Sequence, residues 1–287
     1  MINLKISIIT INYNNKLGLE NTIKSVLRQT YDNIEYIVID GNSTDGSKEV
    51  IEKYKHRISY WVSEPDNGIY NAMNKGAMKA TGEYLLFLNS GDLLIDDNIL
   101  NIIYPEFKSE EDIIFGLLKC YPSGAIGYTD IQTPLTLLDF FEKSPIPHPA
   151  SFIKRNIFEK VQYDESLKIV SDWKFFLQAI VLYEYSYKKI DKVITLFEEN
   201  GISNKYKNCC EEERLQVLKE LLPKAIYSDY FHFSSGFEYK GGNYETFYSR
   251  LSQYRYHKII YMISVLLVRL ISVFKPSARF ARKFPLN

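Results

Sequence analysis

The stretch from Lys5 to Asp40, KISIITINYNNKLGLENTIKSVLRQTYDNIEYIVID, decides the fold of this 287-residue chain. Residues 5–12 and 34–40 are short apolar runs rich in β-branched side chains, which favour strands. Between them, residues 20–28 carry apolar side chains at the three- and four-residue spacing of an amphipathic helix. The stretch therefore predicts a strand, a helix and a second strand, the first βαβ unit of a parallel sheet.

The alternation of strands and helices continues to residue 88. Helices are expected over 47–54 and 69–80, and strands over 58–62 and 83–88. Strands that alternate with helices of this length form a mostly parallel sheet with helices on both faces, so the expected fold class is α/β. Beyond residue 92 the pattern weakens, and 121–149 is expected to form loops with a short helix. The clearer elements there are strands over 113–118 and 190–197 and helices over 171–182 and 211–222.

Polar side chains follow the expected strands at their carboxyl ends. Asn12-Tyr13-Asn14 follows the first strand, and Asp40 ends the second. The third strand is followed by Ser63-Glu64-Pro65-Asp66 and the fourth by Asn89-Ser90-Gly91-Asp92. Ligands of parallel sheets bind at this edge, so these aromatic, amide and carboxylate groups predict a site for a base, a ribose and a metal-bound phosphate.

Two common nucleotide-binding signatures do not fit the sequence. A dinucleotide site needs Gly-x-Gly-x-x-Gly after the first strand, where the chain reads Asn12-Tyr-Asn-Asn-Lys-Leu-Gly18. A P-loop needs a lysine directly after its second glycine, whereas Gly46 is followed by Ser47, and Asp45 would repel a phosphate. The sequence therefore argues against an NAD-type Rossmann site and favours a turn at 41–46.

Composition excludes several other classes. With 46% hydrophobic and 24% charged residues the chain is globular, and its formal net charge of zero argues against a general nucleic-acid binder. Cys120, Cys209 and Cys210 are odd in number and two are adjacent, so a secreted disulfide framework is not expected. No signal peptide is visible at the N-terminus. We therefore expect a reducing, cytoplasmic compartment.

Four stretches of the sequence resemble the family 2 glycosyltransferases. They are Ser7–Asn14, Ser25–Thr30, Ile37–Gly46 and Ala80–Asp92, in the family's order, and the resemblance is close over about the first 95 residues and looser to about residue 200. It implies an inverting enzyme of the GT-A fold, the Rossmann-like fold of nucleotide-diphospho-sugar transferases. Residues 1–205 would form the transferase domain, with the nucleotide-sugar half in 1–95 and the acceptor half in 96–205.

The resemblance implies which residues bind the nucleotide. Ile11, Asn12 and Tyr13 would line it, with the tyrosine stacking near the base, and Asp40 would accept a hydrogen bond from the base imide. The alternative is that Tyr13 is a core residue and Asp40 a turn former. Asp66 and Lys75 would contact the donor sugar or its phosphates, although a turn and a helix cap explain Asp66 as well.

Asn89-Ser90-Gly91-Asp92 occupies the place of the family's Asp-x-Asp-like metal motif. A divalent cation such as Mn²⁺ or Mg²⁺ prefers oxygen ligands and neutralises a diphosphate leaving group. Asn replaces the first Asp, so Asp92 would be the charged ligand, Asn89 would contact the substrate, and the diphosphate itself would supply much of the affinity. The alternative is an Asx-type turn that caps the strand.

Asp172, in Ser171-Asp172-Trp173-Lys174, is similar to the carboxylate that acts as general base in this family. Inversion needs a base on the face opposite the nucleotide, to deprotonate the attacking hydroxyl. Its alternative is a helix N-cap, because Ser and Asp are preferred there. Trp173 would stack on a sugar or anchor the helix, and His148 would lie near the donor phosphates or acceptor, or serve as a structural histidine.

The C-terminal segment, 206–287, is expected to be a helical, basic extension. From Thr246 onward it contains eight Lys or Arg residues and no Asp or Glu. The apolar run Ile259–Phe274 has 16 residues, fewer than the roughly 20 that span a bilayer. We expect a helix in the membrane interface, on the inner face of the cytoplasmic membrane, with packing on the domain or in a homodimer as the alternative.

Together these features predict a metal-dependent transferase that moves a sugar from a nucleoside-diphosphate sugar, expected to be a UDP-sugar, to a saccharide acceptor. The acceptor is expected to be lipid-linked, and the product a bacterial surface polysaccharide such as capsule, O-antigen or exopolysaccharide. Two alternatives remain open. One is a sugar-phosphate nucleotidyltransferase, and the other is a catalytically inactive scaffold that binds nucleotide sugars.

Overall fold

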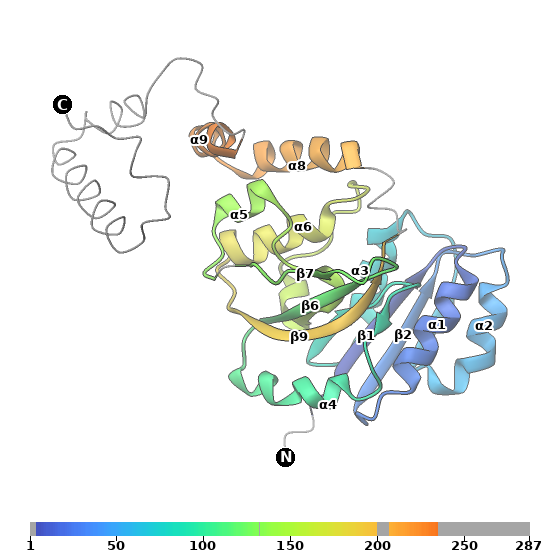
Figure 1. Ribbon diagram of the computed structural model, residues 1–287. Coiled ribbons are helices and arrows are strands. Elements are labelled where there is room, and N and C mark those ends of the chain that lie inside the picture. Colours follow the sequence, from blue (N-terminus) through green and yellow to red (C-terminus); the bar gives the residue numbers. More distant parts are fainter. Residues whose placement is uncertain (1–3, 132, 200–206, 235–287) are drawn as a thin grey trace, which may run out of the picture. The chain divides into compact units, whose positions relative to one another are not determined.

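The computed structural model describes residues 4–131, 133–199 and 207–234, and the first compact unit of the chain ends at Ser234 (Figure 1). Its first half consists of β1 (Ile6–Asn12), α1 (Lys16–Leu27), β2 (Ile34–Asp40), α2 (Ser47–Tyr54), η1 (Lys55–Arg57), β3 (Tyr60–Ser63), α3 (Ile69–Lys79), β4 (Tyr84–Phe87), β5 (Leu93–Leu94), α4 (Ile99–Ile103) and η2 (Tyr104–Ser109). The expected βα alternation up to residue 88 is confirmed.

The second half is less regular. It consists of β6 (Ile113–Tyr121), β7 (Ile126–Gly127), α5 (Leu137–Glu142), η3 (His148–Ala150), β8 (Ser151–Lys154), η4 (Arg155–Glu159), α6 (Ser171–Phe176), the π-helix η5 (Leu177–Leu182), β9 (Tyr187–Glu198), α8 (Lys207–Leu221) and α9 (Lys224–Ser234). The helix expected over 171–182 is therefore divided into an α-helical and a π-helical part. Strand β8 was not anticipated, whereas helix α9 lies in the segment that was expected to be helical.

One mixed sheet runs through the unit in the order β3-β2-β1-β4-β8-β6-β9-β5, with β7 paired to β6. Strands β3, β2, β1 and β4 are parallel, and β1 pairs with β2 from Ile6–Ile34 to Asn12–Asp40. Strand β8 then lies antiparallel to both β4 and β6, while β6 and β9 are parallel. The α/β fold class is confirmed, and the parallel half carries the carboxyl ends at which a ligand is expected.

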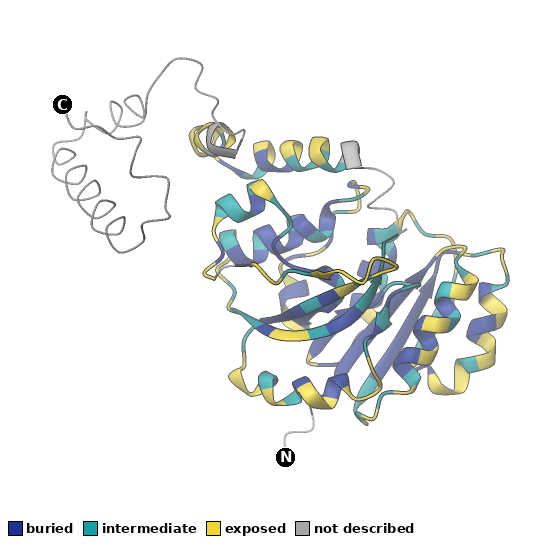
Figure 2. Ribbon diagram, in the orientation of Figure 1, coloured by how far each residue is buried: buried dark blue, intermediate teal, exposed yellow. Residues whose placement is uncertain are grey.

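The alternation of side chains along each strand divides the core into two layers. Ile9 and Ile11 of β1 pack with the buried face of α3, whereas Ile6 and Ile8 pack with α1 and α2. Strands β1, β2 and β4 are buried on both faces (Figure 2), which explains their continuous apolar sequences. Helix α3 approaches β1 closely, because a Cβ on Gly76 would lie 2.4 Å from Ile9 Cγ2.

Helices α8 and α9 lie beside α5 and α6 (Figure 1). The expected helix over 211–222 is confirmed as the main part of α8. No helix in the described ranges combines the length and apolar character that crossing a bilayer requires. The basic segment from Thr246 and the apolar run Ile259–Phe274 lie outside the described residues. The proposed domain division at residue 205 stays a prediction.

Candidate active site

Asp40 is at the centre of the hydrogen bonds that join the strand ends. Its buried carboxylate accepts hydrogen bonds through Oδ1 from Asn12 Nδ2 at 2.7 Å and Ser43 Oγ at 2.6 Å. Oδ2 accepts from Ser43 N at 2.9 Å and Ser63 Oγ at 2.6 Å. A carboxylate offers about four lone-pair sites, and four donors already occupy them. Asp40 therefore fixes the ends of β1, β2 and β3, and the geometry does not support the expected hydrogen bond to a base.

Asn12 keeps one acceptor without a partner. Its Nδ2 donates to Asp40 and also lies 3.1 Å from Ser43 Oγ, whereas its Oδ1 is buried and accepts no hydrogen bond from the described residues. Ile11 is buried beside it, and its carbonyl oxygen accepts from the N–H of Ser90 at 3.1 Å. A buried acceptor without a donor costs about 1–3 kcal/mol, and a bound N–H group would remove that cost.

Tyr13 and Asp66 lie together over Gly41. A Cβ placed on Gly41 would lie 2.6 Å from Asp66 Oδ2 and 3.2 Å from Tyr13 Cδ2, so both side chains depend on the glycine there. Tyr13 is 69% exposed, which rules out the core alternative and leaves its ring free to stack on a ligand. Asp66 Oδ1 also accepts the N–H of Gly68 at 2.9 Å, in the turn that starts α3. Lys75 is paired with Glu64 Oε1 at 2.7 Å.

The segment Asn89–Asp92 is held close to α1 and β9. Thr22 Oγ1 accepts the N–H of Gly91 at 3.0 Å and lies 2.8 Å from the carbonyl oxygen of Asp92. Asp92 is 5% exposed, and its Oδ1 accepts the N–H of Glu198 at 3.2 Å. Burial and, secondly, the charge of Glu198 raise the pKa of Asp92 to about 7. The Glu198 carboxylate lies over Gly91, since a Cβ there would be 2.3 Å from its Oε2.

The oxygens at this segment fit a hard divalent cation. Asp92 and Glu198 supply carboxylates, and Asn89 Oδ1 is buried with no hydrogen-bond partner among the described residues. No cluster of three or more His, Cys, Asp or Glu side chains in the described part of the chain could hold a metal ion by itself. A cation bound here would therefore need further ligands, which the diphosphate of a donor can supply.

Asp172 is the second residue of α6 and is partly exposed. Its Oδ1 lies 3.3 Å from the hydroxyl of Tyr70 and accepts the N–H of Trp173 at 2.9 Å. Tyr70 comes from the first turn of α3, which begins just after Asp66. Asp172 therefore lies beside α3, the helix that starts at the carboxyl ends of the parallel strands. More than 100 residues separate it from Asp66 in sequence.

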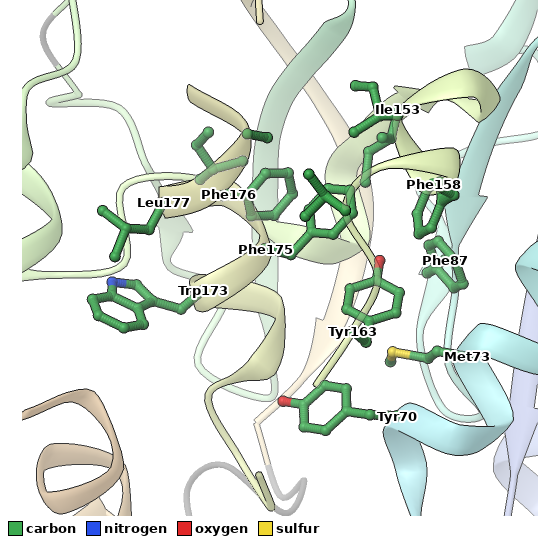
Figure 3. Packing of buried hydrophobic residues seen from close by; sticks show 14 of the residues in the cluster. Tyr70, Met73, Phe87, Ile153, Phe158, Tyr163, Trp173, Phe175, Phe176 and Leu177 are labelled. Atoms are coloured by element: carbon green, nitrogen blue, oxygen red, sulfur yellow. The ribbon is translucent and has the colours of Figure 1, made fainter. Parts of the chain in front are cut away.

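The buried cluster next to Asp172 is rich in aromatic side chains, and Figure 3 shows Tyr70, Tyr163 and Trp173 in it. Burial, with the Asp172 charge second, raises the pKa of Tyr163 well above its usual value and that of Tyr128 to about 12. Burial lowers the pKa of His148, against the opposing effect of Asp172. These side chains are therefore neutral near pH 7, and they give Asp172 largely aromatic surroundings.

The helix-cap alternative for Asp172 is not supported, because Val170 is the N-cap residue of α6. The backbone N–H groups just before α6 are satisfied by Glu213 of α8 instead. Its Oε1 accepts from Lys168 N at 2.8 Å, and its Oε2 lies 3.0 Å from Ile169 N and 3.3 Å from Val170 N. Glu213 thus holds the segment that leads into Asp172.

Trp173 and His148 are not available to a sugar in this structure. Trp173 is 2% exposed and its Nε1 donates to the carbonyl oxygen of Phe140 at 3.1 Å, so the indole anchors α6 and the stacking hypothesis is corrected. His148 is 6% exposed, and its Nε2 lies 2.8 Å from the hydroxyl of Tyr163 while its ring stacks on Phe87. Both residues are buried and pack against aromatic side chains of the hydrophobic core.

Sequence reasoning missed four residues that shape this site, namely Ser43, Tyr70, Glu198 and Glu213. Ser43 had a local signal, since a serine three residues after an aspartate commonly bonds back to it in a turn. The other three carry no such signal, because they reach the site from distant parts of the chain.

A family model described as glycosyl transferase family 2 matches residues 7–162. An uncharacterised glycosyltransferase of Mycobacterium tuberculosis is 33% identical over 188 residues, which cover 62% of this chain and 70% of that protein. The putative teichuronic acid biosynthesis glycosyltransferase TuaG of Bacillus subtilis is 30% identical over 57% of each chain.

A similar fold occurs in the crystal structure of Staphylococcus aureus TarS, residues 1–349, in complex with UDP-GlcNAc. The two structures superpose with a TM-score of 0.62 at 18% sequence identity, over 85% of this chain and 78% of the other. At that identity the likeness concerns the fold alone.

Proposed function

Since this chain belongs to glycosyl transferase family 2, we propose that it transfers a sugar from a UDP-sugar to a hydroxyl group of a saccharide acceptor, with inversion at the anomeric carbon. The observation that carries the proposal is the partly exposed Asp172 carboxylate, which lies 3.3 Å from the hydroxyl of Tyr70 at the start of the helix next to the nucleotide edge. The UDP-GlcNAc bound to TarS supports a uridine nucleotide as donor.

In the proposed step, Asp172 accepts the proton of the acceptor hydroxyl while that oxygen forms its bond to the anomeric carbon. The bond between the anomeric carbon and the diphosphate oxygen breaks, and UDP leaves with the electron pair. Attack from the face opposite the nucleotide inverts the configuration. The backbone N–H of Trp173 and the hydroxyl of Tyr70 hold the carboxylate in one orientation.

For the nucleotide, we assign the base to the exposed ring of Tyr13 and the buried Oδ1 of Asn12. The tyrosine ring stacks on the base. Asn12 Oδ1 accepts the imide N–H of the base, because the carboxylate of Asp40 is already occupied by four donors. Asp40 keeps Asn12 in place through its Nδ2. Ile11 lines the base, and Asp66 and Lys75 remain proposed contacts of the donor sugar and its phosphates.

A divalent cation, Mn²⁺ or Mg²⁺, is the proposed cofactor. Asp92 would hold it, with Glu198 and Asn89 as the neighbouring oxygen ligands. When bound, the cation neutralises charge on the leaving diphosphate. Without it, the burial of Asp92 disfavours the charged carboxylate, so we propose that nucleotide and cation bind together.

We propose that the product is a bacterial surface polysaccharide built on a lipid-linked acceptor. The name of the relative TuaG, from teichuronic acid biosynthesis, supports a polymer of the cell surface. The basic segment beyond Thr246 supports peripheral attachment to the inner face of the cytoplasmic membrane, with homodimer contacts as its other proposed use. The charge balance of the whole chain gives no reason to propose a nucleic-acid partner.

The test compares the full-length chain with Asp172→Asn and, as a matched control, Asp130→Asn at an exposed carboxylate. UDP release is measured with a panel of UDP-sugars and saccharide acceptors, and UDP binding by calorimetry with and without Mn²⁺. We expect Asp172→Asn to bind UDP normally and to lose about 10²–10⁴-fold in transfer rate.

The reduced metal motif is the observation that favours the second candidate, an inactive nucleotide-sugar-binding scaffold. Metal-dependent UDP binding without sugar transfer, for every UDP-sugar and acceptor in the panel, would support that candidate. Normal transfer by Asp172→Asn would show that the base is a different residue.

A further inference from the structure

Arg214 of α8 is a cation beside the candidate active site that the proposed function does not use. Its Cζ lies 5.4 Å from the centre of the Trp173 ring, the residue that follows Asp172. Its Nε is buried without an acceptor, and no carboxylate in the described part of the chain forms an ion pair with it. A buried guanidinium N–H without an acceptor costs free energy, which a ligand oxygen would recover.

The position of Arg214 relative to Asp172 is fixed by its neighbour in sequence. Glu213 binds the backbone N–H groups of Lys168, Ile169 and Val170, the three residues before α6. A charge-assisted contact to three N–H groups is strong and directional. Helix α8, which carries Arg214, is therefore attached to the start of α6, which carries Asp172.

Tyr128 lies within electrostatic reach of both charges. The Asp172 carboxylate raises the pKa of the Tyr128 phenol, after the effect of burial, and Arg214 lowers it. Tyr128 also has a φ of 68°, a backbone conformation that is rare for an aromatic residue. Such strained residues persist where the surrounding structure holds them, and they concentrate at ligand sites. Tyr128 is thus a strained residue that the charges of both Asp172 and Arg214 affect.

We propose that Arg214 binds an oxyanion of the acceptor, a phosphate or carboxylate group near the hydroxyl that Asp172 deprotonates. This inference rests on the proposed function of Asp172. A guanidinium pairs with either oxyanion through two parallel N–H···O bonds, and Arg214, which lies over the Trp173 ring, keeps an Nε without an acceptor among the described residues. An acceptor with a negative charge would be repelled by Asp172, and Arg214 offsets that repulsion.

The location favours the acceptor over the donor diphosphate as the source of the oxyanion. Arg214 shares its surroundings with Trp173 and Tyr128, next to the carboxylate that faces the acceptor. Asp92, where the diphosphate is proposed to bind, has Glu198 as its charged neighbour instead. The two ends of the site therefore carry separate charged groups.

The chain offers a direct reporter for this proposal, because Trp61 and Trp173 are its two tryptophans. In a Trp61→Phe background, the fluorescence of Trp173 reports on the cation stacked against it. The full-length protein is titrated at constant ionic strength with glycerol 3-phosphate, with uncharged glycerol and, separately, with UDP and Mn²⁺. Arg214→Gln is compared with Arg214→Lys and with Lys219→Gln, a cation of the same helix that lies 5.8 Å from the Tyr227 ring centre.

We expect a saturable response to glycerol 3-phosphate and none to glycerol. Arg214→Gln should weaken glycerol 3-phosphate binding at least about tenfold, while Arg214→Lys recovers part of it because the charge remains. Lys219→Gln should bind as the parent does, and UDP affinity should be equal in all four proteins, which also shows that they fold.

Three results would overturn the assignment. One is the absence of a glycerol 3-phosphate response in the parent protein, and another is an unchanged response in Arg214→Gln. The third is a loss of UDP affinity in Arg214→Gln together with displacement of glycerol 3-phosphate by UDP, which would assign Arg214 to the donor. A parent protein that does not bind UDP would contradict the proposed function instead.

Discussion

At Asp40, four hydrogen bonds converge on one buried carboxylate, and two of the donors are the hydroxyls of Ser43 and Ser63. Ser63→Ala removes the donor that joins β3 to β2 at this point. We expect the free energy of unfolding to fall by about 1 kcal/mol and UDP to bind more weakly, since Asn12 depends on the same carboxylate. Urea denaturation and calorimetry measure the two effects. The exposed Ser123→Ala serves as control, and unchanged values in Ser63→Ala would contradict this role of Asp40.

Glu35 is a second buried carboxylate, at the opposite end of the sheet. It accepts hydrogen bonds from Ser7 Oγ at 2.6 Å, from Thr81 N at 2.7 Å and from Lys5 Nζ at 3.1 Å. Burial raises its pKa, but these donors outweigh burial and lower the pKa to about 2, below the ordinary glutamate value of 4.5. Its stabilising contribution is therefore complete above pH 4.5 and is lost as the pH falls toward 2.

Glu35→Gln should lower the free energy of unfolding by about 2 kcal/mol at neutral pH, because charged hydrogen bonds are lost. The difference from the parent protein should shrink as the pH falls from 4.5 toward 2, which urea denaturation at a series of pH values measures. Glu20→Gln is the control, since Glu20 pairs with Lys24 and Lys53 at the surface, where solvent screens the interaction. If the difference in unfolding free energy between Glu35→Gln and the parent protein stays constant down to about pH 2, the lowered pKa of Glu35 is contradicted.

Between elements, the contact of α8 with the start of α6 determines where Asp172 lies. Glu213→Ala leaves the N–H groups of residues 168–170 without their acceptor, so the segment before Asp172 loses its fixed position. We expect the transfer rate to fall at least about tenfold. The KM for the UDP-sugar should change little, because the substitution does not alter Tyr13 or Asn12, the proposed contacts of the nucleotide.

Steady-state kinetics of Glu213→Ala and Glu212→Ala test this role, since Glu212 is an exposed neighbour on the same helix. Equal rates in the two variants would show that the contact is merely structural. A rise in KM without a change in rate would place α8 at the donor instead of the base.

At the scale of the whole molecule, the proposed cation site depends on parts of the chain that are 106 residues apart, because Asp92 follows β4 and Glu198 ends β9. Asp92 is buried, so the cation and the diphosphate should stabilise each other there. We expect Mn²⁺ to raise UDP affinity at least about tenfold in the parent protein and not in Asp92→Asn.

Calorimetry of UDP with Mn²⁺ or with EDTA measures that difference. Asp97→Asn is the control, since Asp97 is an exposed carboxylate paired with Arg28. Equal Mn²⁺ dependence in Asp92→Asn and the parent would contradict the assignment of Asp92 as the ligand.

The sequence alone determined the parallel half of the sheet and the edge at which the site lies. Strand 34–40 and helix 47–54 have the bounds that their patterns predicted, because apolar periodicity and turn residues act over a few neighbouring positions. The polar residues after β1, β2 and β4 could be placed together for the same reason, since parallel strands align their carboxyl ends.

Tertiary structure decided what those residues do. Asp40 is saturated by Ser43 and Ser63, and Trp173 is buried under Arg214, which no local pattern indicates. Glu198 and Glu213 reach the site from strands and helices far along the chain. Periodicity tells whether a side chain faces a core, but its partner is set by packing and charge between distant segments, and only the folded chain specifies those contacts.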